Sequence, residues 1–218
     1  MRRTKADAEE TRRQILCAAE RVFYEKGVST ATMEDVAHAA GVTRGAIYWH
    51  FENKTALFIA LYKSVPLPQK DMVMEEMAAA NGNALALVER MAGDWLDHLA
   101  QDTQRQRILA ILLRCDYSGD LEAMLNEQQQ VDDEHMKALE MAFAAAAANG
   151  QLTPCWTPGS AASALRWMMK GLCTEWLLYG RRFDIARQGK EGLRRLFQSF
   201  TRDPAEASAP DVRSTELP

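Results

Sequence analysis

Side chains that suit contact with a polyanion are concentrated between residues 32 and 54, in the stretch TMEDVAHAAGVTRGAIYWHFENK. Arg44 carries parallel N–H groups that match the O6 and N7 acceptors of guanine in the major groove of DNA. Tyr48, His50 and Lys54 follow it closely, and all three are residue types that donate to phosphate oxygens. The chemistry of this stretch is that of a contact with double-stranded DNA, provided that the fold places these side chains on one surface.

The same stretch has the pattern of two short helices joined by a tight turn. Thr32 is a good N-cap for a helix over 33–40, and Gly41 ends that helix. Thr43 can cap a second helix that continues to about Trp49. This is the pattern of a helix-turn-helix, but ordinary two-helix corners share it.

The second helix carries more aromatic surface than its core contact needs. Ile47 and Phe51 lie four residues apart and can face the core. Tyr48 and Trp49 then point largely away from it. Such a pair is unfavourable in water unless something covers it, and a neighbouring helix or a DNA duplex could do so.

Residues 12–63 resemble the N-terminal domain of the TetR family of transcriptional regulators. The resemblance rests on RRQILCAAERVFYEKGVSTATMEDVAHAAGVTRGAIYWHFENKTALFIAL and on its frame T-x-x-x-V-A-x-x-A-G-V-x-x-G-x-I-x-x-H-F-x-N-K. It implies a helix-turn-helix whose second helix is the recognition helix. It also implies contacts with DNA phosphates at Thr32, Tyr48, His50 and Lys54. The contacts that it implies with the DNA groove are at Thr43, Arg44, Gly45 and Trp49.

The rest of the chain is also predicted to be helical, so we expect an all-α protein of about nine helices. Its N-terminal three-helix domain, with the helix-turn-helix, would be followed by a larger C-terminal helical bundle. Apolar residues at spacings of three and four predict these longer helices, and no run alternates as a strand does. The bundle's helices are expected over about 83–101, 105–117, 121–148, 161–179 and 193–200.

We expect three segments along the chain. Residues 1–64 form the DNA-binding domain, and residues 65–202 form a domain for ligand binding and dimerisation. The polar, proline-containing stretch 203–218 is expected to be a disordered tail.

The distribution of charge fits a basic head on an acidic body. The chain holds 26 Lys and Arg against 30 Asp and Glu, a net charge of −4. Residues 1–63 hold ten basic and eight acidic residues, or +2, and the remaining 155 residues hold 16 and 22, or −6. Such an asymmetry is expected when one end of a protein meets a polyanion.

The sequence also argues against several classes of protein. It has no run of about 18 apolar residues for a membrane span, and its N-terminal stretch lacks the apolar segment of a secretion signal. Its four cysteines lie apart, without a C-x-x-C pair or nearby histidine pairs, which indicates neither disulfides nor a zinc site. We therefore expect a cytoplasmic protein without a metal or cofactor.

Enzyme motifs are missing as well. The sequence contains no H-E-x-x-H, G-x-S-x-G, G-x-G-x-x-G or P-loop. The run Asp132-Asp133-Glu134-His135 is the nearest candidate, but adjacent residues diverge by about 100° around a helix, so a solvated face explains it better. His98 and His135 are better explained as surface or hydrogen-bonded core residues than as ligands. We expect no enzyme activity.

The body is rich in methionine and tryptophan, which suits a cavity for varied apolar ligands. Nine of the eleven methionines lie between Met72 and Met169. Thioether side chains repack readily around different partners, although stripes at helical spacing more often form ordinary core. The candidates for effector binding are Met91, Trp95, Leu99, Leu112, Leu139 and Phe143.

The segment 161–179 is apolar on two faces and so needs two partners. The family resemblance implies that it and 193–200 pair with their copies across a two-fold axis, although burial inside one subunit is the alternative. The candidate interface residues are Leu165, Met169, Leu172, Trp176, Leu193, Leu196, Phe197 and Phe200.

Together these features predict a repressor that binds operator DNA as a homodimer and is released by small hydrophobic effectors. The stretches QLTPCWTP and ALRWMMKGLCTEWLLYG make the body similar to the branch of the family that represses multidrug efflux pumps. One alternative is a TetR-like regulator of a metabolic operon with a specific metabolite inducer. Another, from a different class, is a helical small-molecule-binding protein without a DNA function.

Overall fold

The computed structural model describes residues 5–65 and 83–201. These residues form nine α-helices and no β-strand, which confirms the prediction of an all-α protein. An isolated antiparallel bridge joins Leu152 to Thr201, and a short 3₁₀ helix, η1 (Gly119–Leu121), precedes α8. The helices are α1 (Lys5–Lys26), α2 (Met33–Ala40), α3 (Arg44–His50), α4 (Lys54–Lys63), α6 (Ala84–Gln101), α7 (Thr103–Arg114), α8 (Glu122–Ala148), α9 (Pro158–Leu178) and α10 (Ile185–Phe200).

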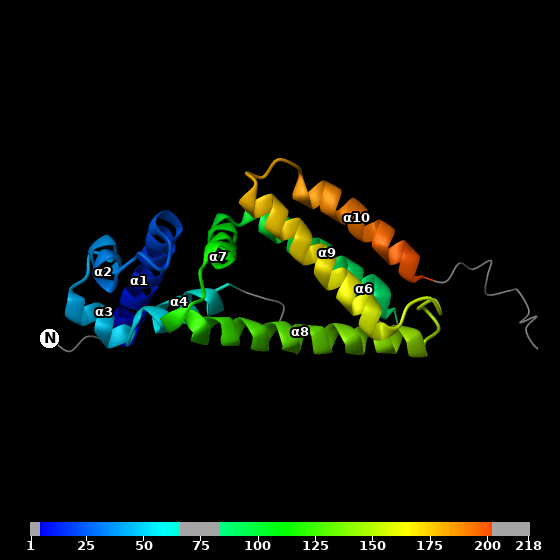
Figure 1. The fold of residues 1–218 in the computed structure, drawn as a ribbon, viewed down its shortest axis with the longest axis horizontal. Coiled ribbons are helices and arrows are strands. Elements are labelled where there is room, and N and C mark those ends of the chain that lie inside the picture. Colours follow the sequence, from blue (N-terminus) through cyan, green and yellow to red (C-terminus); the bar gives the residue numbers. More distant parts are fainter. Residues whose placement is uncertain (1–4, 66–82, 202–218) are drawn as a thin grey trace, which may run out of the picture.

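The helices form an elongated molecule with a small head and a longer body (Figure 1). The head consists of α1 to α4, with α1, α2 and α3 at one end of the molecule. The body consists of α6 to α10, where α8 runs along one side and α9 packs against it. α10 lies on the outer side and packs against α6 and α9. The predicted helix-turn-helix is therefore exposed at the far end from α10.

The short helices of the head begin at the caps that the sequence predicts. Thr32 Oγ1 accepts from Asp35 N at 3.0 Å while the Asp35 carboxylate accepts from Thr32 N at 3.0 Å, which completes a capping box. Thr43 caps α3 as predicted, through one hydrogen bond, and Asn53, which was not singled out above, caps α4 through another. Gly41 ends α2 with φ of 67°, in the left-handed region that favours glycine.

The core of the head does not stop at the end of α4. Buried side chains of α1, α2, α3 and α4 form one cluster with Ile108 and Ile111 of α7 and with Met124 of α8. Arg107 Nη1 lies 3.1 Å from Glu20 Oε1, so an ion pair joins α7 to α1, and the Glu20 side chain is only 7% exposed. The unit that packs around the head is thus larger than residues 1–64.

The core of the body is aromatic where α8 meets α10. The rings of Phe143, Phe197 and Phe200 lie with centroids 5.2–6.3 Å apart, and all three side chains are buried. α10 approaches α6 closely at Gly189, where a Cβ atom would lie 2.7 Å from Leu96 Cδ1. Glycine thus allows the close approach of the two helices, because a larger residue would displace the Leu96 side chain.

Several body helices differ from their predicted bounds because of their caps. α7 begins two residues earlier than predicted, with Asp102 as its N-cap, and ends at Arg114. Thr157 caps α9, which starts at Pro158, and Asp184 caps α10, which starts at Ile185. The predicted tail over 203–218 lies outside the described residues. In the described part of the chain, no helix is long and apolar enough to cross a membrane.

Candidate DNA interface and effector cavity

The outward side of α3 carries side chains that the core does not use. Trp49 is 72% exposed and Tyr48 is 40% exposed, whereas Ile47 is fully buried. A Cβ atom on Gly45 would meet no atom within 4 Å, so the space in front of it is open. Arg44 and Tyr48 lie one helical turn apart, as do Gly45 and Trp49, so each pair lies on one side of the helix. The groove contacts predicted on α3 therefore lie at the surface.

Arg44 is held loosely by its neighbours. Its Nε lies 3.1 Å from Glu34 Oε1 of α2, and its guanidinium carbon lies 5.7 Å from the centre of the Tyr48 ring. The Arg44 side chain is 74% exposed, and ion pairs at such exposure contribute little to stability. Arg44 can therefore exchange Glu34 for an acceptor on a base.

The other predicted DNA contacts also serve the fold of the head. The Thr32 and Thr43 hydroxyl oxygens accept the capping hydrogen bonds of α2 and α3, which leaves each O–H group as a donor. His50 is half-buried, with its ring 4.6 Å from the Trp49 ring. Lys54 Nζ donates to Ser29 O at 2.9 Å and to Ala31 O at 3.0 Å, which ties α4 to the loop before α2. An ammonium group has three donors, so one remains for a phosphate.

Replacing Arg44 by alanine is expected to lower operator affinity by about 1–3 kcal/mol if this side chain contacts a base. The sequence preference should relax at one symmetric pair of operator positions. Gel-shift titrations with single-base operator variants and with scrambled DNA measure both effects. An equal loss of affinity for operator and scrambled DNA would remove base recognition from Arg44.

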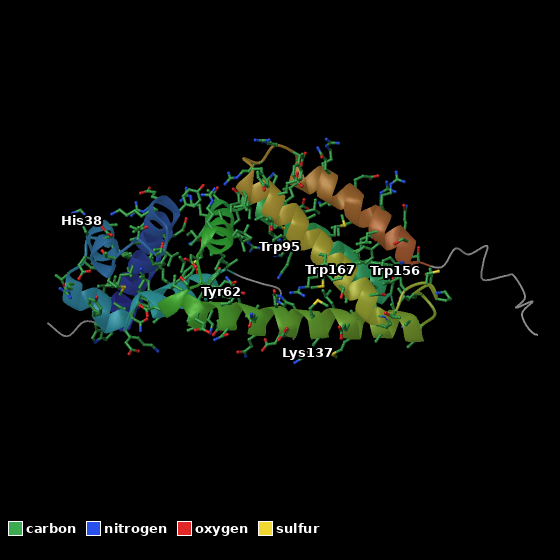
Figure 2. All side chains as sticks on the ribbon, in the orientation of Figure 1. His38, Tyr62, Trp95, Lys137, Trp156 and Trp167 are labelled. Carbon is green, nitrogen blue, oxygen red and sulfur yellow. The ribbon has the colours of Figure 1, made fainter. Side chains whose placement is uncertain are left out.

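Replacing Lys54 by alanine is expected to lower the free energy of unfolding by about 1–2 kcal/mol, because two carbonyl oxygens lose a charged donor. It should also weaken binding to every DNA sequence about equally and flatten the salt dependence by about one counterion. Thermal denaturation and salt titrations of DNA binding measure these effects. Lys137→Ala is the matched control, because Lys137 is exposed on α8 (Figure 2). If stability and salt slope both matched the control, both roles of Lys54 would be excluded.

The body contains a cavity of about 460 Å³ between α6, α7, α8 and α9. Four predicted effector residues line it, namely Met91, Trp95, Leu112 and Leu139. The other two predicted residues, Leu99 and Phe143, do not line it and are fully buried in the core. Phe143 is held there by the Phe197 and Phe200 rings. An apolar stripe marks burial, but it does not distinguish a cavity wall from solid core.

One wall of the cavity is polar, which the sequence analysis missed. Asp132 and His135 of α8 line the cavity, although their run was predicted to be a solvated face. That prediction holds only for Asp133 and Glu134, which are exposed. Residues three apart on a helix share a face, and this spacing could have signalled the pair. Other polar side chains in the lining are Tyr62, Gln128, Arg166, Lys170 and Thr174.

The cavity reaches the head through Tyr62 of α4. Burial raises the pKa of the Tyr62 phenol to about 12, and the nearby carboxylates of Asp132 and Glu127 act in the same direction. The phenol is therefore neutral at pH 7. The cavity wall thus includes a residue from a helix of the head.

Most of the side chains predicted for the dimer interface are buried within one subunit. They already pack there and cannot also lose water between two copies. This applies to the buried residues Leu165, Trp176, Leu193, Phe197 and Phe200, and Met169 lines the cavity instead. Leu172 and Leu196 are half-buried and also pack inside the subunit, or beside its core.

One of these helices, α9, nevertheless exposes a large aromatic side chain to solvent. Trp167 is 68% exposed in the middle of α9, and Tyr179 at its end is 61% exposed. Gly171 lies one turn after Trp167 and is open in front of its Cα. Figure 2 shows Trp167 on α9, away from the head. Sequence periodicity could not predict this face, because a single tryptophan among small and polar residues does not form an apolar stripe along the helix.

The described residues offer no metal centre. Within 5–65 and 83–201, no three His, Cys, Asp or Glu side chains are grouped so that they could hold a metal ion. The cysteines in these ranges are free thiols.

Family models match both parts of the chain. The family described as "Bacterial regulatory proteins, tetR family" matches residues 15–61, and "MAATS-type transcriptional repressor, C-terminal region" matches residues 83–201. The transcriptional repressor BepR of Brucella suis is 34% identical over 206 residues, which cover 94% of this chain and 98% of BepR. Relatives of this kind are transcriptional regulators.

Solved structures agree with the sequence matches. NalD, the secondary repressor of the MexAB-OprM multidrug efflux pump in Pseudomonas aeruginosa, has a TM-score of 0.83 and 34% identity over 91% of this chain and 100% of that structure. A complex of SmeT with triclosan has a TM-score of 0.80 and 27% identity over 96% of this chain and 99% of that structure. SmeT is the repressor of the Stenotrophomonas maltophilia multidrug efflux pump SmeDEF. The predicted resemblance is confirmed, and the chain belongs to the TetR family of bacterial regulatory proteins.

Proposed function

We propose that this protein represses a multidrug efflux operon, binds its operator as a homodimer, and leaves the DNA when a small hydrophobic effector occupies the cavity. The observation that carries this proposal is the presence, in one chain, of the exposed α3 surface and a largely apolar cavity of about 460 Å³. The similarity to NalD, SmeT and BepR supports it. A repressor of this kind acts in the cytoplasm, where its operator DNA lies, and needs no catalytic group.

Direct contacts join the head to the helices that line the cavity. Tyr62 of α4 lines the cavity, and the ion pair between Glu20 and Arg107 fixes the head to α7. Lys63 Nζ lies 2.6 Å from Glu127 Oε1, which adds a contact between α4 and α8. A ligand that separates α7 from α8 would therefore move α1 and α4. The mechanism is a shift between two separations of the heads in the dimer, only one of which reaches two successive major grooves.

The exposed face of α9 supplies the surface for the homodimer. Trp167 projects from it, and Gly171 one turn later allows a second helix to approach closely. A two-fold axis near Gly171 would bury the Trp167 side chain of each subunit against the partner subunit. Each interface residue then contributes to the interface twice, once from each subunit. α9 thus remains a dimerisation helix, through side chains other than those that the sequence predicts.

A gel shift with the DNA upstream of the protein's own gene tests the proposal. The protein should bind this DNA in preference to scrambled DNA, and a panel of hydrophobic antimicrobials should release it. Release by many dissimilar compounds supports efflux control, whereas release by one metabolite alone supports regulation of a metabolic operon. A protein that binds the compounds but no DNA would be a ligand-binding protein without this function.

A further inference from the structure

The polar wall of the cavity contains a cluster of three charged side chains, one acidic and two basic. Arg166 Nη2 of α9 lies 3.0 Å from Asp132 Oδ2 of α8, and Lys170 Nζ bonds the same oxygen. All three residues line the cavity. Burial of Asp132 raises the pKa of its carboxyl, but the hydrogen bonds from Lys170 and Arg166 outweigh this and lower the pKa overall. One negative charge therefore faces two positive charges.

No second carboxylate in the cavity balances the excess. Asp132 is the only acidic residue among the described residues that line it. Glu127, the next carboxylate towards the head, is paired with Lys63. Asp133 and Glu134 are exposed on other faces of α8. The cavity is thus apolar over most of its wall and carries a net positive charge at one side.

The Arg166 guanidinium also has hydrogen-bonding capacity to spare. Its Nε is shielded from solvent and has no hydrogen-bond partner, and a donor in that state is unfavourable. Only Nη2 is used by Asp132. A rotation of this half-buried side chain towards the cavity would bring the planar fork to an acceptor, and a carboxylate matches that fork with two parallel bonds.

We infer that the cavity selects apolar ligands that carry an anionic group, such as an aromatic carboxylate, over neutral or cationic ligands of the same shape. The apolar part of the ligand lies among the methionine and leucine side chains, and its anionic group lies at Arg166 and Lys170. The inference rests on the proposed function only in taking this cavity as the effector site. It adds a charge rule to a site that otherwise selects by size and hydrophobicity.

Three probes of one shape test this rule: naphthalene-2-carboxylate, naphthalene-2-carboxamide and 2-naphthylmethylammonium. Calorimetric titration should show the carboxylate binding about tenfold more tightly than the amide, and the ammonium binding most weakly. Quenching of tryptophan fluorescence gives a second readout, because Trp95 lines the cavity. The amide serves as the baseline for apolar binding in every variant.

Variants then assign the preference to the cluster. Arg166→Gln and Lys170→Gln should each reduce the tenfold preference to about threefold or less, and Asp132→Asn should increase carboxylate affinity while leaving the amide unchanged. Lys170→Gln preserves the pair between Arg166 and Asp132, so it remains informative if Arg166→Gln loses stability. Arg187→Gln is the matched control, because Arg187 is 75% exposed on α10 and does not line the cavity.

Each remaining outcome overturns the inference. Equal affinities for the three probes, or no binding of the carboxylate at millimolar concentration, would leave the cluster as a link between α8 and α9. Tightest binding of the ammonium, lost in Asp132→Asn, would assign the wall to cations. The proposed function survives all of these results if uncharged compounds still release the operator, so the two failures are distinguishable.

Discussion

Replacing Trp167 by glutamate is expected to convert the homodimer to monomers and to lower operator affinity by about 10²–10⁴-fold. A tryptophan at the centre of an interface commonly contributes 2 kcal/mol or more, and two-fold symmetry doubles the loss. The glutamates would in addition face one another across the axis. A monomer binds one half-site, so it loses the effective concentration that the second half-site provides. Sedimentation and gel-shift titration measure the two effects.

The control for this experiment is Met141→Glu. Met141 is also a large apolar side chain at the surface, 43% exposed, but it lies on α8. It should leave both the dimer and operator binding unchanged. Both variants should keep the helical content of the wild type, because neither side chain is buried. A Trp167→Glu protein that remains dimeric at micromolar concentration would place the interface elsewhere.

The same reasoning shows why other tryptophan and phenylalanine residues make poor tests. Trp176 is 6% exposed and its Nε1 donates to Phe183 O at 2.9 Å inside the subunit. Phe197 is 2% exposed. A charge at either position would be buried without a partner and would unfold the body before it reported on assembly. The periodicity of α9 predicts burial correctly, but it cannot say whether the buried partner belongs to the same chain.

The local structure of the head was predictable because its signals are short. Thr32, Thr43 and Asn53 cap their helices through a backbone N–H three residues ahead, so each start is determined within one turn of sequence. Gly41 ends α2 by its own backbone conformation. An ordered frame of such signals is also what makes the family resemblance specific. The exposure of Trp49 follows from the same local geometry.

The first two turns of α10 were not predicted, because a glycine at one of its buried positions interrupts the apolar spacing. The buried positions of this helix recur every four residues, at Ile185, Gly189, Leu193 and Phe197. The second position is glycine, where a Cβ atom would lie 2.7 Å from Leu96 Cδ1 of α6. Glycine normally weakens a helix, so the periodicity is hidden where the helix packs most closely. The burial of this glycine comes from a tertiary contact with α6, which the local sequence does not show.

The charged wall of the cavity was hidden for a similar reason. Asp132 and Arg166 are 34 residues apart and belong to different helices. Taken alone, Asp132 lies in an acidic run and Arg166 lies in an apolar segment, so each has an ordinary explanation. Only the packing of α8 against α9 brings them together. The apolar part of the cavity was easier, since Met91, Trp95, Leu112 and Leu139 all belong to amphipathic stripes.

Replacing Leu139 by tryptophan is expected to give a repressor that binds operator but no longer responds to effectors. Leu139 lines the cavity from α8, and a larger side chain there reduces a volume of about 460 Å³ without touching the head. Operator affinity without ligand should therefore stay close to that of the wild type. Ligand affinity should fall, and ligand-induced release should fall with it because less ligand is bound at a given concentration. The effect of bound ligand on operator binding equals the effect of operator on ligand binding.

Met141→Trp is the matched control for this variant. It adds a tryptophan two residues later on the same helix, where the side chain is exposed and does not line the cavity. The control should bind effectors as the wild type does, with a coupling of about 1–3 kcal/mol, or roughly 5–150-fold in operator affinity. Titration of a hydrophobic antimicrobial with and without operator gives both sides of this cycle. If Leu139→Trp lost ligand binding while the compound still released its DNA, the compound would act outside this cavity and the proposed mechanism would be wrong.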